Sequence, residues 1–348
     1  MLTRYTLLTR FGFGLSLFLG GCASSIRELP VYTGEPVVFH LNEREKKIVD
    51  IQYLGVGGYL FRYGKDALMT APSITNPGLL KIASMTRLKT NEALVDKLLP
   101  LTEDVEMILV GHTHYDHLLD VPYVMQKHAR KAIVYGSGTM GHIMAAAVHK
   151  SRIVTVDAYA ARSKAPGTWI YNRNRTIRFM PIESEHAPHF AGMKFLPKGP
   201  YHEDLTRLPR TVFGWVEGQT YAYLIDFVDE QGRIVFRVHY QDAASNPPLG
   251  FIQDLPQNEQ KRTDIAILCV ASFEQVKDYP EGILRDIQPR DIILGHWEDF
   301  FRNQKSPVKV LRTTNVRKFI KRLESVIPSD SRWFMPLPFT QMRFASRN

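Results

Sequence analysis

The chain has 348 residues, of which 44% are apolar, and its formal net charge at neutral pH is +9. This length and apolar content predict one large globular domain with a sizeable core. No recognised nucleic-acid-binding module accompanies the basic surplus, so we expect no nucleic-acid partner.

The N-terminus has the features of a bacterial lipoprotein signal. Arg4 and Arg10 precede residues 11–21, an apolar and glycine-rich stretch. This stretch is too short to span a bilayer but has the length of a signal-peptide core. It ends in Leu19-Gly-Gly-Cys22, which resembles a lipobox, the motif whose cysteine receives the lipid. The alternatives are a secretory signal without lipid and a buried N-terminal segment.

These observations predict three regions along the chain. Residues 1–21 are expected to form the signal peptide, residues 22–47 the lipidated cysteine and a tether, and residues 48–348 the globular domain. The residue after the cysteine is Ala23, whereas an aspartate there would favour retention in the inner membrane. We therefore expect an outer-membrane lipoprotein that faces the periplasm and is held to the membrane by lipid on Cys22.

From Ile48 onward, strand-like and helix-like segments follow each other closely. The predicted strands are 48–54, 58–63, 67–69, 105–110, 132–135, 177–182, 234–240, 264–271 and 291–294. The predicted helices are 91–99, 141–150 and 316–327. This alternation indicates an α/β (α+β) protein with two packed sheets and helices outside them. The basic face of the last helix is expected to be solvated, although it could also approach anionic lipid headgroups.

The segment 112–117, which reads His-Thr-His-Tyr-Asp-His, directly follows the predicted strand 105–110. His112 and His114 are two positions apart in extended chain, so their side chains project to the same side. Asp116 and His117 lie where the chain turns into a helix, so they can face a second ion. Imidazole suits zinc and similar metals, and the carboxylate adds a harder oxygen ligand. The spacing therefore predicts a metal site.

This H-x-H-x-D-H string after a strand resembles the signature of the metallo-β-lactamase-fold hydrolases. The resemblance implies a four-layer αββα sandwich and further ligands after later strands. Three residues match these positions: His186 after strand 177–182, Asp242 after strand 234–240 and His296 after strand 291–294. His189 is the alternative to His186, which we prefer because it lies nearer to the end of its strand.

The resemblance also implies how the ligands are shared between two divalent metal ions. One ion would be held by His112, His114 and His186, the other by Asp116, His117 and His296, with Asp242 and a water or hydroxide between them. We expect Zn²⁺, with Mn²⁺ and iron as alternatives, because His and Asp ligands suit all three. Asp116 or Asp242 would accept the proton of the attacking water. The expected chemistry is metal-assisted hydrolysis.

The string His-Tyr-Asp-His-Leu-Leu-Asp most resembles a branch with phosphodiesterases, the phospholipase acting on N-acyl phosphatidylethanolamine and a sugar-lactone hydrolase. We therefore expect a membrane-anchored hydrolase of a phosphodiester or related ester, with a small molecule or a lipid as substrate. The alternatives are a lactone or thioester hydrolase and a non-catalytic envelope lipoprotein. Two departures from the family pattern concern bracing residues: the strand at 67–69 is followed by Thr70 instead of aspartate, and Gln241 and Ala243 flank Asp242.

Three further features have competing interpretations. The segment Gly136-Ser-Gly-Thr-Met-Gly141 satisfies G-x-G-x-x-G, but we favour a tight turn over nucleotide binding or a phosphate grip. Cys269 lies in an apolar run, so we expect it to pack in the core. Trp297 and Phe190 are equally compatible with the wall of a substrate pocket and with the core.

Overall fold

The computed structural model describes residues 25–34, 48–163, 165–188, 196–197, 199–304 and 306–346. The predicted signal peptide, Cys22, His189 and Phe190 lie outside these residues. Within the described ranges, every helix is too short or too polar to cross a bilayer.

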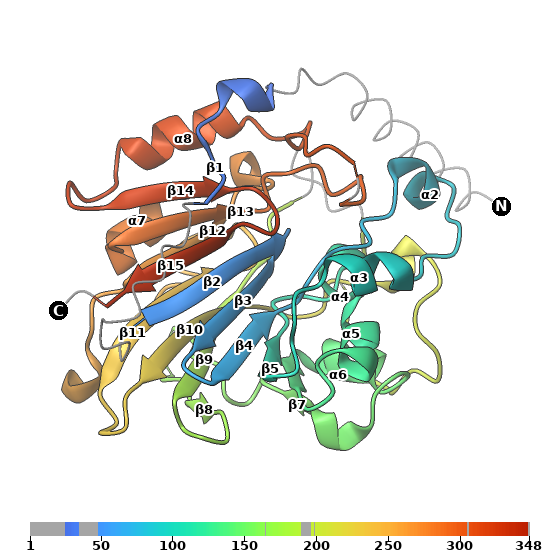
Figure 1. The fold of residues 1–348 in the computed structure, drawn as a ribbon, viewed down its shortest axis with the longest axis horizontal. Coiled ribbons are helices and arrows are strands. Elements are labelled where there is room, and N and C mark those ends of the chain that lie inside the picture. Colours follow the sequence, from blue (N-terminus) through green and yellow to red (C-terminus); the bar gives the residue numbers. More distant parts are fainter. Residues whose placement is uncertain are drawn as a thin grey trace.

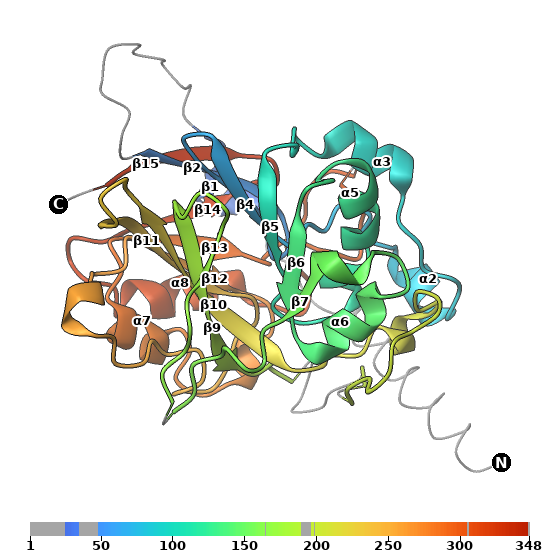
Figure 2. The same ribbon diagram turned by 90° about the horizontal axis from the view of Figure 1, so that it is seen from below.

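Two mixed β-sheets pack face to face (Figures 1 and 2). The seven-stranded sheet has the order β15 (Gln341–Ala345), β2 (Ile48–Gly55), β3 (Gly58–Tyr63), β4 (Asp66–Thr70), β5 (Val105–Leu109), β6 (Ile133–Gly136), β7 (Ile153–Thr155). The eight-stranded sheet has the order β1 (Val31–Tyr32), β14 (Arg332–Pro336), β13 (Asp291–Gly295), β12 (Ile265–Cys269), β11 (Ile234–Gln241), β10 (Thr220–Val228), β9 (Ile177–Ser184), β8 (Ile170–Tyr171). In each sheet a parallel group of strands adjoins an antiparallel group.

Helices cover the outer faces of both sheets (Figures 1 and 2). They are α2 (Leu79–Ala83), α3 (Glu92–Leu98), α4 (Tyr115–Leu118), α5 (Val121–Lys127), α6 (Gly138–Met144), α7 (Glu281–Ile287) and α8 (Val316–Glu324). Helices α3 to α6 share a core with the seven-stranded sheet, and α7 and α8 share another with the eight-stranded sheet. The expected four-layer αββα sandwich is therefore confirmed.

The core between the two sheets is rich in aromatic side chains. The rings of Phe61 on β3 and Phe227 on β10 lie 6.3 Å apart, and those of Tyr59 and Tyr240 lie 6.1 Å apart. The Tyr59–Tyr240 contact joins the sheets beneath the ligand loops, since Tyr240 lies two positions before Asp242, whereas Phe227 pairs with Phe236 toward the other end of the sheet. The large rings therefore fix the spacing of the two sheets close to the candidate site.

Some element boundaries differ from the sequence prediction. Helix α6 begins at Gly138 instead of Gly141, because the Ser137 side chain caps it by accepting a hydrogen bond from the Met140 amide at 3.2 Å. It ends at Met144, and α8 ends at Glu324, so both predicted helices were too long at their C-termini. Strands β10, β14 and β15 were not predicted, nor were the two-residue strands β1 and β8.

Candidate metal centre

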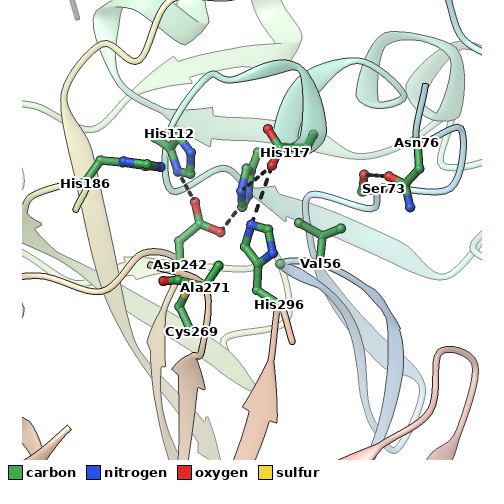
Figure 3. A network of polar contacts seen from close by, with 12 residues as sticks. Val56, Ser73, Asn76, His112, His117, His186, Asp242, Cys269, Ala271 and His296 are labelled. Carbon is green, nitrogen blue, oxygen red and sulfur yellow. Dashed lines mark hydrogen bonds and ion pairs between the residues drawn. The ribbon is translucent and has the colours of Figure 1, made fainter. Parts of the chain in front are cut away.

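The predicted ligands meet at one edge of the sandwich, where loops from both sheets converge (Figure 3). His112 and His114 follow β5, and α4 begins immediately after them. From the other sheet, His186 follows β9, Asp242 directly follows β11 and His296 directly follows β13. Because all of these strands end on the same side of the sandwich, residues far apart in the sequence become neighbours.

Three groups of ligand-type side chains overlap at this edge, and within each group the candidate donor atoms lie within 4.8 Å of one another. The groups are His112, His114 and His186; His112, His117 and Asp242; and Asp116, His117 and His296. All of these side chains are buried except His186, which is half-buried. The structure thus brings together all seven residues that the sequence singled out, in the two predicted groups with Asp242 between them.

Several ring nitrogens in the cluster are buried without a hydrogen-bond partner. They are His112 Nε2, His117 Nε2 and His296 Nδ1. An unsatisfied buried polar atom costs about 1–3 kcal/mol, so it needs a compensating partner. A divalent cation is such a partner for an imidazole nitrogen, and the mixture of imidazoles and carboxylates fits zinc and related metals. The residues present therefore fit two metal ions.

Asp242 lies at the middle of the cluster. Its Oδ2 is 2.6 Å from His112 Nδ1 and its Oδ1 is 3.0 Å from His117 Nδ1, while the Tyr240 hydroxyl donates to Oδ1. Burial alone would raise the pKa of this carboxyl, but the nearby His117 and His112 hold it well below its usual range. Asp242 is therefore ionised at neutral pH, as a metal ligand must be.

The other carboxylate, Asp116, is also ionised. Burial would raise its pKa, but the charge of His117 and the hydrogen bond and charge of His296 lower the pKa to about 2. Asp116 Oδ2 lies 3.6 Å from His117 Nε2 and 3.5 Å from His296 Nε2. Burial tends to lower the pKa of His117, but Asp242 and Asp116 outweigh it and the pKa is raised.

Two glycines let the backbone approach Asp242 very closely. A Cβ at Gly111 would lie 2.3 Å from Asp242 Oδ2, and a Cβ at Gly57 would lie 2.5 Å from Asp242 Oδ1. Real Cβ atoms do not come so near to other heavy atoms. Any larger residue at either position must therefore displace the central carboxylate.

A buried hydrogen-bond chain positions His296. The His296 amide donates to the Tyr53 hydroxyl at 3.0 Å, and this hydroxyl donates to Glu298 Oε2 at 2.6 Å. Glu298 Oε1 in turn accepts from the Val56 amide at 2.5 Å. His296 and Val56 both have left-handed backbone conformations, with φ of 56° and 55°. Such conformations cost energy outside glycine, so the chain of bonds holds two strained positions in place.

Thr70 and Tyr240 connect the turn between β2 and β3 to the same network. Thr70, which stands where the family pattern has an aspartate, accepts from the Tyr59 amide at 2.8 Å and donates to the Gly57 carbonyl at 2.6 Å. The Tyr240 hydroxyl lies 2.8 Å from the same carbonyl. Thr70 was singled out from the sequence as a departure at a bracing position, whereas Tyr240, Tyr53 and Glu298 were not predicted. The only feature of the sequence that could have indicated these residues is a polar group at or near the end of an otherwise apolar strand.

Two further residues singled out from the sequence, Trp297 and Cys269, are packed in the core. Trp297 is fully buried in the core beneath α7 and α8, and its indole donates to the Pro336 carbonyl at 3.1 Å, so it does not line a pocket. The Phe300 ring instead lies 4.8 Å from the His296 ring. The Cys269 thiol is buried, and burial raises its pKa well above the usual value. Its role is therefore structural.

The glycine-rich segment 136–141 forms the turn into α6 and is closely covered. A Cβ at Gly136 would lie 3.1 Å from the Val110 carbonyl oxygen. Across the turn, a Cβ at Gly218 would lie 2.8 Å from the Thr139 Cβ. A Cβ at Gly141 would lie 2.9 Å from Thr155 Cγ2, whereas one at Gly138 would make only an ordinary contact, 3.8 Å from Asp157 Oδ2. Close packing therefore accounts for Gly136 and Gly141, as a tight turn predicts.

Comparison with known proteins supports the fold. Igni18, described as a metallo hydrolase from the archaeon Ignicoccus hospitalis, superposes with a TM-score of 0.50 at 11% sequence identity, covering 86% of this chain and 100% of that chain. YhfI from Bacillus subtilis, described as a metallo-β-lactamase fold protein, gives a TM-score of 0.46 at 11% identity, with coverage of 86% and 100%. No protein-family model matches the sequence, and no curated protein matches it either. The two mixed sheets with flanking helices are a metallo-β-lactamase-like fold.

Proposed function

We propose that this protein is a metal-dependent hydrolase that cleaves a phosphodiester or a related ester with the help of two divalent cations. The observation that carries the proposal is the pair of ligand groups that meet at Asp242, with buried ring nitrogens that lack a hydrogen-bond partner. When bound, such cations lower the pKa of a coordinated water toward neutrality and stabilise negative charge in the transition state. We take Zn²⁺ as the first candidate, with Mn²⁺ and iron as alternatives.

The ligand set divides into two triads and a shared carboxylate. His112, His114 and His186 would hold one cation, Asp116, His117 and His296 the other, and Asp242 would lie between them. The Glu298–Tyr53 chain would orient His296, and Tyr240 would orient Asp242 through the hydroxyl that donates to its Oδ1. Partners of this kind fix ligand geometry and tune metal affinity.

Of the two carboxylates, Asp116 is the better candidate to accept the proton of the attacking water. Both oxygens of Asp242 already have partners, since Oδ2 faces His112 while Oδ1 faces His117 and Tyr240. The contacts of Asp116 Oδ2 to ring nitrogens are longer, at 3.5 and 3.6 Å. Its carboxyl is ionised at neutral pH, as a proton acceptor requires.

The proposed substrate is a phosphodiester, with phospholipid included. Lactones and thioesters are the alternative substrates, and a non-catalytic envelope lipoprotein is the alternative from outside enzymes. The test is metal analysis of the purified chain together with hydrolysis of bis(p-nitrophenyl) phosphate, an aliphatic lactone and an acyl thioester.

We expect roughly two metals per chain and cleavage of the phosphodiester, because two metal ligand groups need two ions. Asp116→Asn should abolish hydrolysis. Asp330→Asn is the control, because Asp330 is a surface carboxylate paired with Arg262. Two metals with cleavage of the lactone or thioester alone would move the proposal to those substrates. Metal without hydrolysis of any of the three would leave the non-catalytic alternative.

We also propose that the enzyme is held at the periplasmic face of the outer membrane by lipid on Cys22. The support is the sequence of the first 22 residues, in which an apolar stretch ends at Gly-Gly-Cys. Mass spectrometry of the mature chain should find an acylated Cys22 at its N-terminus. A mature chain that begins elsewhere, or one that begins at Cys22 without an acyl group, would contradict this anchor.

A further inference from the structure

The segment Gly78–Lys89, which contains α2, exposes apolar side chains to solvent; we call it the rim segment. The side chain of Leu80 is 81% exposed and that of Met85 is 45% exposed. Both views of the fold place α2 at the outer edge of the molecule (Figures 1 and 2). Two large exposed apolar side chains within one short segment offer an apolar surface that a partner can cover.

The same segment is positively charged. Lys81, Arg87 and Lys89 are exposed. Arg210 adjoins the segment, since its carbonyl accepts a hydrogen bond from the Leu88 amide at 2.7 Å, and its side chain is exposed too. The sequence contains no Asp or Glu between Asp66 and Glu92. None of the four cations takes part in an ion pair with another described residue.

Helix α8 shows the contrast. Three of its four cations, Arg317, Lys318 and Arg322, form ion pairs with Glu28, Glu274 and Glu281, while Lys321 is exposed. Its apolar side chains Val316, Phe319 and Leu323 are buried. Most of the basic face of α8 is therefore neutralised within the protein, whereas that of the rim segment is not.

The rim segment lies beside the metal centre. A Cβ at Gly78 would lie 4.0 Å from the Phe301 carbonyl oxygen, and the rings of Phe300 and Phe301 lie 4.4 Å apart. Phe300 in turn contacts the His296 ring. Figure 3 shows Ser73 and Asn76, which lead into the rim segment, on the Val56 side of the ligand cluster. Any surface that docks on the rim segment is thus brought close to the candidate catalytic site.

The loop that leads into the rim segment is firmly held. The Asp120 carboxylate accepts from the Ile74 and Thr75 amides at 2.8 Å each and from the Thr75 hydroxyl at 2.5 Å. Asp120 follows α4, the helix that carries two of the candidate ligands. The exposed side chains therefore project from a rigid base that is connected to the metal centre.

We propose that the rim segment docks directly onto an anionic lipid surface. A bilayer interface accepts exposed aliphatic side chains and attracts cations at the same place, which is the combination found here. A second copy of the chain fits less well, since a symmetric contact would bring the same cations against each other. A nucleic acid would attract the cations but would give Leu80 and Met85 no apolar environment. This contact is additional to any lipid on Cys22 and does not depend on hydrolysis.

The test uses the full chain with Cys22→Ser, labelled with an environment-sensitive fluorophore on a new cysteine at position 85. The control carries the label at position 101, because Leu101 is 81% exposed but lies outside the rim segment. The probes are vesicles of phosphatidylglycerol with phosphatidylethanolamine and vesicles of phosphatidylcholine alone. We expect a blue shift of the label, and quenching by a lipid-embedded nitroxide, at position 85 on anionic vesicles only.

Charge-neutralised variants sharpen the test. The triple variant Lys81→Gln, Arg87→Gln, Lys89→Gln should lower partition onto anionic vesicles on the order of a hundredfold, since each cation near such a surface contributes about fivefold. The matched control, Arg317→Gln, Lys318→Gln, Arg322→Gln, makes the same change in net charge and should leave partition within about threefold.

Two outcomes would overturn the inference. One is a label at position 85 that stays in water while the chain is bound to anionic vesicles. The other is a blue shift that follows protein concentration without lipid, which would point to self-association instead.

Discussion

The Glu298→Gln substitution tests whether the hydrogen-bond chain behind His296 positions a metal ligand. Glu298 is 3% exposed and uses both carboxylate oxygens as acceptors, one for the Val56 amide and one for the Tyr53 hydroxyl. Glutamine keeps the shape but offers one acceptor oxygen and a donating amide, so one of the two donors loses its partner. Tyr53, which accepts from the His296 amide, is then free to shift.

The expected size of the effect follows from these contacts. Losing one hydrogen bond to a charged group costs about 1.5–3 kcal/mol of folding stability. Replacing a residue that orients a metal ligand typically lowers metal affinity about 10–100-fold. Metal affinity should fall at the group of Asp116, His117 and His296. The group of His112, His114 and His186 should keep its metal affinity. Binding of the two metals should therefore become clearly unequal.

Isothermal titration with Zn²⁺ and the visible spectrum of the Co²⁺ form measure both affinities. Glu259→Gln is the control, because Glu259 is a half-buried carboxylate that also has two partners, the Trp169 indole at 2.7 Å and the Arg178 guanidinium at 3.0 Å. It has no contact with the ligand cluster. If Glu298→Gln loses stability while both metal affinities stay unchanged, the chain supports the fold only and the positioning argument is wrong.

Three further predictions concern the centre and the core. Gly111→Ala should weaken metal binding at least about tenfold, because its Cβ would lie 2.3 Å from Asp242 Oδ2; zinc titration measures the loss. Zn²⁺ at about a thousand times its dissociation constant should stabilise the fold by about 4 kcal/mol, measured by thermal unfolding with and without chelator; an unchanged Tm would contradict a preformed site. Burial lowers the pKa of His239 to about 4. Its Nε2 donates to the Gly250 carbonyl at 2.7 Å and its buried Nδ1 has no partner. Since the unfolded chain takes up this proton near pH 6.5, stability is full above that pH and should fall by about 3 kcal/mol by pH 4. His239→Gln should remove that part of the pH dependence in urea titrations.

The positions of the ligands could be predicted because each follows a strand with a clear apolar pattern. His112, His186, Asp242 and His296 all come just after such strands, and the ends of strands in one sandwich edge converge. The choice of His186 over His189 rested on the same reasoning. His186 lies in a ligand group with His112 and His114, and His189 is outside the described residues.

The supporting contacts could not be predicted, because they depend on the register between elements far apart in the chain. Tyr53 and Glu298 are 245 positions apart, and a sequence pattern contains no information on which hydroxyl meets which carboxylate. Strand β10 was not predicted for a related reason. It is an interior strand of its sheet and is buried along its whole length, so it lacks the alternation of an exposed strand. It also contains a charged residue, Asp226, which two arginines neutralise.

Each ligand triad combines residues from both sheets, and this has a consequence for how the protein matures. His112 and Asp242 are 130 positions apart in the sequence. The ligand set of either metal ion can therefore assemble only after both halves of the chain have folded and docked. Metal would then be acquired last and would act as a cross-link between the sheets. We expect the metal-free protein to open first along this edge, so protease cleavage or hydrogen exchange in the ligand loops would report metal loading directly.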